Sequence, residues 1–142
     1  MPLLDDATRE DVRRRFADLK APVNLVLFKD PSASSSSDEI AELLTELAGL
    51  SPKVTLEEHE AGAASASLAL RYAIARTPAI VVESDRDWGI RYYGAPNGYE
   101  FGSLLEVMVD IARGEVDLAP AIRAGLATLR DPVHIQVFTT PT

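Results

Sequence analysis

The chain contains a copy of its own beginning. Residues 13–28 return as residues 123–138, at a constant offset of 110 positions and without a gap. Matching or similar side chains occupy the pairs Val12/Ile122, Arg13/Arg123, Leu19/Leu129, Pro22/Pro132, Val23/Val133, Leu25/Ile135, Leu27/Val137 and Phe28/Phe138. Because a recurrence at fixed spacing indicates a duplicated structural unit, we divide the chain into one complete unit over residues 1–118 and the first helix and strand of a second, truncated unit over residues 119–142.

Composition excludes several classes of partner. The 142 residues carry a net charge of −8, which disfavours nucleic acid and anionic membrane surfaces, since both are bound through basic patches. No apolar run approaches the roughly 20 residues of a membrane helix, and residues 1–6 lack the basic start of a secretion signal. We therefore expect a cytoplasmic protein. The sequence has no cysteine, which rules out disulfides, thiolate zinc sites and cysteine nucleophiles within it.

The first half of the complete unit predicts two helices and two strands. We expect a helix from Asp5 or Asp6 to Leu19, with Pro22 ending it, and a central strand over residues 23–28. Residues 30–37 have the composition of a polar loop, in which Ser36 or Ser37 would cap a helix over residues 38–50. A short alternating strand follows over residues 54–58.

The second half of the unit predicts a helix, a hairpin and a last helix. Alanine-rich residues 63–75 favour a helix, and residues 79–83 and 88–93 flank a turn and predict an antiparallel hairpin. Residues 99–113 complete the unit as a helix. Helices that alternate with two strands, followed by a hairpin and a helix, predict an α/β thioredoxin-like fold: a central mixed four-stranded sheet flanked by helices.

Several segments resemble a known family. Residues 39–44, 50–55, 77–78 and 91–101 are similar to the N-terminal unit of the protein disulfide oxidoreductases built from tandem thioredoxin or glutaredoxin-like units, and to the related N-terminal domain of the flavoprotein component of alkyl hydroperoxide reductase. The resemblance covers nearly the whole chain, and the sequence from Gly94 to Phe101 is its most specific part. It implies that each first strand leads to a Cys-x-x-Cys at a helix start.

The first unit departs from this pattern where the dithiol would lie. The loop after the first strand reads Pro31-Ser-Ala-Ser-Ser-Ser-Ser37, so either Ser32 and Ser35 or Ser34 and Ser37 take the cysteine positions. A serine hydroxyl needs an adjacent base to act as a nucleophile, and no histidine is near in the sequence. We therefore expect no catalytic residue, no cofactor and no metal in this chain.

The resemblance also marks a substrate groove. Thr77 and Pro78 match the loop before a cis-proline that binds an extended substrate in the family, although the same turn would be kept for structure alone. Gly94 to Phe101 is either a recognition loop or, more simply, a turn that anchors the last helix. We expect structural roles for His59 and His134, because two separate histidines do not form a metal site. Trp88, Tyr92 and Tyr93 are expected to pack along the hairpin.

In the second unit the resemblance puts a cysteine after Thr140-Pro141-Thr142, at position 143. The chain is then either cut at this point or followed by a UGA codon that encodes selenocysteine. The strand predicted over Val133 to Phe138 needs a partner, which would be this chain's own sheet or a second molecule. Two functions follow: a redox-inactive half of a tandem oxidoreductase that docks a redox partner protein, or a free-standing module that binds peptide or protein clients.

Overall fold

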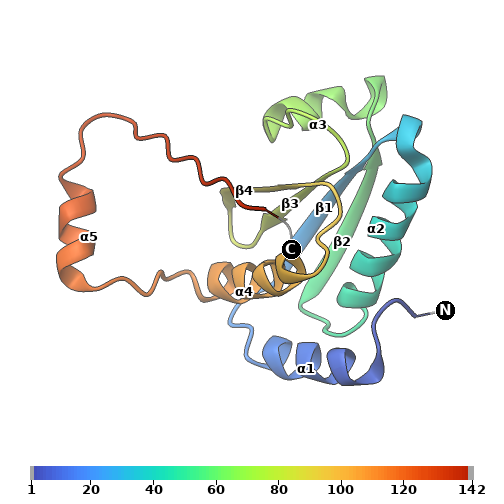
Figure 1. Ribbon diagram of the computed structural model, residues 1–142, viewed down its shortest axis with the longest axis horizontal. Coiled ribbons are helices and arrows are strands. Elements are labelled where there is room, and N and C mark those ends of the chain that lie inside the picture. Colours follow the sequence, from blue (N-terminus) through green and yellow to red (C-terminus); the bar gives the residue numbers. More distant parts are fainter. Residues whose placement is uncertain (1, 141–142) are drawn as a thin grey trace.

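The computed structural model describes residues 2–140, which build a four-stranded mixed sheet with the order β2-β1-β3-β4 (Figure 1). Its strands are β1 (Val23–Lys29), β2 (Val54–Glu60), β3 (Ala79–Glu83) and β4 (Asp87–Tyr93). β1 runs parallel to β2 and antiparallel to β3, and β3 pairs antiparallel with β4. The central position of the first strand and the hairpin are therefore confirmed, as is the α/β class.

Alternation along β1 supplies both hydrophobic layers. Leu25 and Leu27 point to one face of the sheet, where they are fully buried beneath α1 (Asp6–Ala17), α2 (Ser34–Ala48) and α4 (Tyr99–Arg113). Val26 and Phe28 point to the other face, where they pack with the residues of α3 (Ala66–Arg71) and the turn after it. α3 lies apart from the other three helices in Figure 1.

The ends of α1 follow the sequence signals closely. The Asp5 carboxylate accepts a hydrogen bond from the Thr8 backbone N–H at 2.7 Å, as an N-cap should. The helix ends at Ala17 rather than at Leu19, but Leu19 is still buried in the core and its N–H donates to the Phe16 carbonyl. The predicted helix over residues 99–113 is confirmed as α4.

The expected start of α2 is wrong. A 3₁₀ turn, η1, spans Pro31–Ala33, and α2 begins at Ser34 instead of residue 38. Neither Ser36 nor Ser37 is the cap, since Ala33 precedes the helix and forms no side-chain cap bond. The reason is tertiary: Ser37 is pulled inward and is only 1% exposed, which commits the whole serine run to the helix.

The predicted helix over residues 63–75 is too long. A 3₁₀ turn, η2, covers Ala63–Ser65, and α3 then ends at Arg71. Ala73 adopts a positive φ of 51°, and the Ile74 N–H returns to the Ala69 carbonyl. This tight turn lets Tyr72 and Ile74 both pack against the Phe28 face of the sheet, which a continued helix would not allow.

Residues 119–140 pack against little of the remaining structure. They form α5 (Pro120–Ala127) and an extended segment, and Figure 1 shows α5 standing away from the sheet. The prediction of a strand over Val133 to Phe138 is wrong for the described residues, because the segment pairs with no strand there and these end residues are 61% and 89% exposed. Extension of this chain's own sheet is thereby contradicted. Pro141 and Thr142 of the Thr-Pro-Thr sequence lie outside the described residues.

Within residues 2–140, none of the helices is both long and apolar enough to cross a membrane.

Candidate functional site at the start of helix α2

The sheet brings two predicted site segments together. Phe28 at the end of β1 is in register with Ala79 at the start of β3, so the loop after β1 adjoins the loop before β3. Asp30, in the first loop, lies close enough to the Thr77 side chain for it to help lower the pKa of the Asp30 carboxyl. The structure therefore places the serine-rich loop and the Thr77-Pro78 turn side by side.

Asp30 organises the serine-rich loop. Its carboxylate accepts hydrogen bonds from the Ser32 hydroxyl at 2.6 Å and from the Ser32 backbone N–H at 2.9 Å, and so caps η1. These bonds from Ser32 are the main reason why the pKa of Asp30 lies below its ordinary value, with smaller contributions from Thr77 and the Ala33 backbone. A carboxylate held in this way is a poor proton acceptor.

The four candidate serines occupy different environments. Ser32 is exposed in η1, and Ser34 and Ser35 are exposed in the first turn of α2. Ser37 is buried, where its hydroxyl oxygen accepts a hydrogen bond from the Asp30 N–H at 2.9 Å and its hydroxyl donates to the Asp30 carbonyl at 3.4 Å. The pattern is an exposed hydroxyl at the helix start and a buried hydroxyl one turn further along.

The Thr77-Pro78 turn is held by the segment after β4. The Thr77-Pro78 peptide bond is cis, and the Pro78 carbonyl accepts a hydrogen bond from the Gly94 N–H at 3.0 Å. Gly94 has a φ of 88°, a conformation that favours glycine. Thr77 and Pro78 are both half-buried. The segment from Gly94 to Phe101 thus acts, at least in part, as a structural turn.

The histidines and acids do not build a second centre among residues 2–140. The His59 ring packs on the Phe28 ring, with centroids 5.7 Å apart, and its Nε2 is 3.7 Å from the Glu57 carboxylate. His134 is exposed in the extended segment. The described residues contain no group of three or more metal-ligating side chains that could hold a metal ion.

Sequence reasoning missed Asp30 as the organising residue of the site. Its position before Pro31 carries the signal, because an acceptor side chain followed by proline at the first helical position is typical of a helix start. The serine run drew attention to the later positions instead. Asp30 is the residue through which the loop, the helix start and Thr77 meet.

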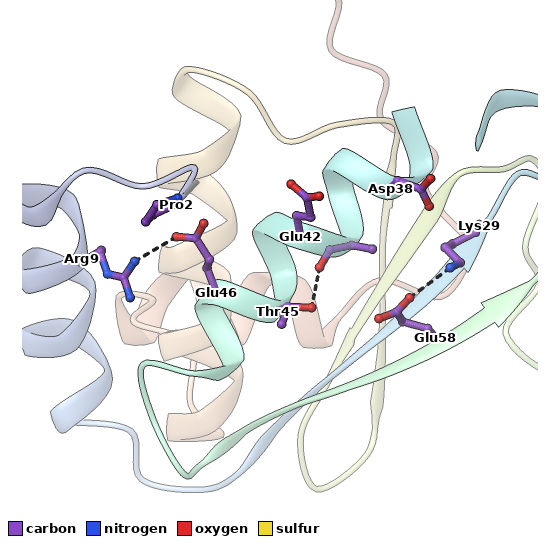
Figure 2. Close-up of a pocket in the computed structure, with 9 residues that line it drawn as sticks. Pro2, Arg9, Lys29, Asp38, Glu42, Thr45, Glu46 and Glu58 are labelled. Carbon is purple, nitrogen blue, oxygen red and sulfur yellow. Dashed lines mark hydrogen bonds and ion pairs between the residues drawn. The ribbon is translucent and has the colours of Figure 1, made fainter. Parts of the chain in front are cut away.

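A second surface feature lies along α2. Figure 2 shows a hollow of about 700 Å³ whose cations are each matched with a glutamate: Arg9 lies 3.5 Å from Glu46, and Lys29 lies 3.2 Å from Glu58. Glu46 also accepts hydrogen bonds from the backbone N–H groups of Leu3 and Leu4, which hold the N-terminal segment against α2. No sequence pattern indicated this arrangement.

No protein-family model matches the chain. Among curated proteins it is 34% identical over 103 residues to the alkyl hydroperoxide reductase protein AhpF of Escherichia coli (strain K12), a match that covers 72% of this chain and 18% of that protein. The chain therefore spans about a fifth of the length of this relative.

Solved structures agree with this similarity. The NTD_N/C domain of the alkylhydroperoxide reductase AhpF from Enterococcus faecalis (V583) matches with a TM-score of 0.78 and 27% identity, over 89% of this chain and 61% of that chain. A protein disulfide oxidoreductase from Aeropyrum pernix K1 matches with a TM-score of 0.76 and 21% identity, over 90% of this chain and 57% of that chain, and shows the shared fold. The predicted resemblance is thus confirmed: the chain is a cysteine-free thioredoxin-like domain similar to the N-terminal domain of the alkyl hydroperoxide reductase AhpF.

Proposed function

We propose that this chain is a redox-inactive thioredoxin-like unit of a thiol-disulfide oxidoreductase system, and that it serves as a structural and docking platform for a partner unit that carries the dithiol. Two features support the platform role. The chain resembles only an N-terminal part of its relatives, and its own residues 119–140 repeat the helix and apolar segment with which the first unit begins. The partner is then a second thioredoxin-like unit or a separate redox protein.

The chemistry of the loop after β1 carries the proposal. Disulfide exchange needs a thiolate as the nucleophile, and the residues present are serines whose hydroxyls stay protonated at neutral pH. The nearest carboxylate, Asp30, already binds the Ser32 hydroxyl and has a lowered pKa, so it does not activate that hydroxyl as a base. The loop has the architecture of a redox site without its reactive atom.

We infer that Ser34 and Ser37 correspond to the two cysteines of the family's dithiol. α2 begins at Ser34, and Ser37 lies one turn further along the same helix. Ser34 is exposed, as an attacking thiol must be, whereas Ser37 is buried beneath it. The alternative pair is less suitable, because Ser32 lies in η1 before the helix and Ser35 is exposed to solvent.

Reduction of insulin in the presence of dithiothreitol tests both statements. The unmodified chain should leave the rate at the dithiothreitol background, because it holds no thiol. The double variant Ser34→Cys/Ser37→Cys should close an intramolecular disulfide and accelerate the reduction, whereas Ser32→Cys/Ser35→Cys serves as the matched control with the same number of added thiols. Catalysis by the unmodified chain would refute the redox-inactive assignment, and faster catalysis by the control pair would refute the register.

A free-standing peptide-binding module is the second candidate. Within residues 2–140, the backbone of the half-buried Thr77 takes part in no turn, loop or strand-pairing hydrogen bond, so its N–H and C=O remain available to an extended peptide. Amide chemical shifts recorded during titration with an extended peptide would test it. Perturbations confined to Thr77 and its neighbours would favour this module, and an unchanged spectrum would remove it.

A further inference from the structure

A second hollow, distinct from the loop around Asp30, lies on the side of α2 that faces α4. It measures about 680 Å³, within the range of ligand sites, and is bounded by α2, the segment before α4 and the N-terminal segment. We call it the α2 groove. Its apolar lining comes from Leu4, Ile40, Leu43, Ala95, Pro96 and Phe101. Ile40 forms the buried floor, while Leu43 and Phe101 are half-buried on the walls.

The polar rim of the α2 groove is anionic. Glu39 and Glu42 line it, both are exposed, and neither forms an ion pair with any residue of the range 2–140. No lysine, arginine or histidine lines the groove among the described residues. An apolar floor beside unneutralised carboxylates is therefore what this groove offers to a partner.

The neighbouring hollow shows why these carboxylates have no cation. Arg9 and Lys29, which lie on the other flank of α2 in Figure 2, are already paired with Glu46 and Glu58. Residues 38–60 contain seven acids and one lysine, a net charge of 1 − 7 = −6 out of the total of −8. The negative charge of the molecule is thus concentrated on the part of the chain that supplies one wall of the groove.

We propose that the α2 groove docks a cationic amphipathic helix of a partner protein. Apolar side chains of such a helix would enter between Leu43 and Phe101, and its lysines or arginines would meet Glu39 and Glu42. Nucleic acids and anionic membranes have the wrong charge for this surface. The groove has this chemistry whether or not residues 119–140 open a second unit, so the inference is independent of the function proposed above.

Binding of a model peptide tests the proposal. The probe is a helix of about 14 residues made of leucine and lysine in amphipathic order, and its control is a peptide of the same composition in scrambled order. Calorimetry at low salt should detect the amphipathic peptide, and its amide shift changes should centre on Ile40, Leu43 and Phe101. The scrambled peptide should bind at least tenfold more weakly.

Paired variants locate the contact. Glu39→Gln/Glu42→Gln should weaken the amphipathic peptide roughly five- to tenfold, as expected for two rim ion pairs. Glu106→Gln/Glu115→Gln removes the same charge from exposed, unpaired positions in and just after α4, and should change the affinity less than twofold. Circular dichroism checks that all variants fold. Leu43→Ser should weaken binding without altering the net charge.

Three results would overturn the proposal. Equal binding of the scrambled peptide would reduce the effect to net charge, and equal weakening by the control pair would place the contact elsewhere. Sedimentation showing a dimer of the unmodified chain that Glu39→Gln/Glu42→Gln dissociates would identify a second copy of the chain as the occupant. None of these results depends on insulin reduction, so the proposal and the redox-inactive assignment can fail separately.

Discussion

Asp30 accepts the hydrogen bonds that the start of η1 would otherwise leave unmade. Because the Ser32 bonds favour its charged form, its folded-state pKa lies below the value of about 3.9 for an unfolded aspartate. A group of this kind stabilises the fold at pH values above its unfolded pKa, and the stabilisation disappears as the pH falls through the folded pKa. The residue thus links the stability of the loop to pH.

Asp30→Asn should therefore lower the free energy of unfolding at pH 7, and the difference from the unmodified chain should shrink as the pH falls below about 4. Urea unfolding followed by circular dichroism at pH 7 and near pH 3 would measure both values. Asp131→Asn is the matched control, since Asp131 is exposed beyond α5. A difference that stayed constant over this range would contradict the assigned role.

Ser37 is the other residue on which the start of α2 depends. Replacing it with alanine would leave the Asp30 N–H without its acceptor in a buried position, at a cost of about 1–3 kcal/mol. Ser35→Ala, in the same helical turn but exposed, should stay within about 0.5 kcal/mol of the unmodified chain. Urea unfolding of the two variants compares them directly. Equal effects would mean that the buried hydrogen bond contributes nothing specific.

At the scale of elements, α3 is too short to be stable alone and is held to the sheet by Arg91 of β4. The Arg91 guanidinium binds the Asp87 carboxylate through two hydrogen bonds of 2.8 and 2.6 Å, and its Nε donates to the Tyr72 carbonyl at 2.8 Å. The pairing raises the pKa of Arg91 and lowers that of Asp87. One side chain thereby joins the end of α3 to the edge strand.

Arg91→Lys keeps the charge but cannot reproduce this three-bond geometry. We expect a loss of about 1–3 kcal/mol in the free energy of unfolding, together with faster hydrogen exchange of the α3 amides. Arg113→Lys is the control, because Arg113 is exposed and lies 3.9 Å from its nearest carboxylate. Unchanged exchange in α3 would show that the helix is held by the packing of Tyr72 alone.

The elements that the sequence predicts well are those whose pattern and packing agree. β1, the hairpin and α4 have the apolar period that their buried faces require, and the structure contains all of them. The alanine content of residues 63–75 predicts one helix, yet the packing of Tyr72 and Ile74 on Phe28 imposes a left-handed turn at Ala73. Local propensity is a weak guide wherever a tertiary contact decides the backbone.

The candidate site divides in the same way. The serine loop and the Thr77-Pro78 turn were accessible from the sequence through their resemblance to a family, and the register of β1 with β3 brings them together. The role of Asp30 was not accessible, because it depends on hydrogen bonds to Ser32 and Ser37 that form only when α2 begins at Ser34. A polar run states that a loop or cap is near, but not which hydroxyl turns inward.

For the whole molecule, the extended segment after α5 is the largest exposure of apolar surface. Ile135, Val137 and Phe138 are 80–89% exposed, and their backbone groups pair with no strand among residues 2–140. The two edges of the sheet differ as acceptors: β2 carries several glutamates, whereas β4 presents Trp88, Ile90 and Tyr92 beside an apolar cavity of about 220 Å³. Charged edges resist pairing, so β4 is the edge on which an added strand is expected.

A chain ending at Asp131 separates association from folding. The intact chain should self-associate in sedimentation experiments through Val133 to Phe138, and the shortened chain should be monomeric. The free energy of unfolding measured at low concentration should differ by less than about 0.5 kcal/mol, because the removed residues bury little surface in the described structure. Glu39→Gln/Glu42→Gln should leave this association intact, since it acts at the α2 groove. A monomer before and after shortening, with equal stability, would mean that the segment does not mediate self-association and that its partner is another unit.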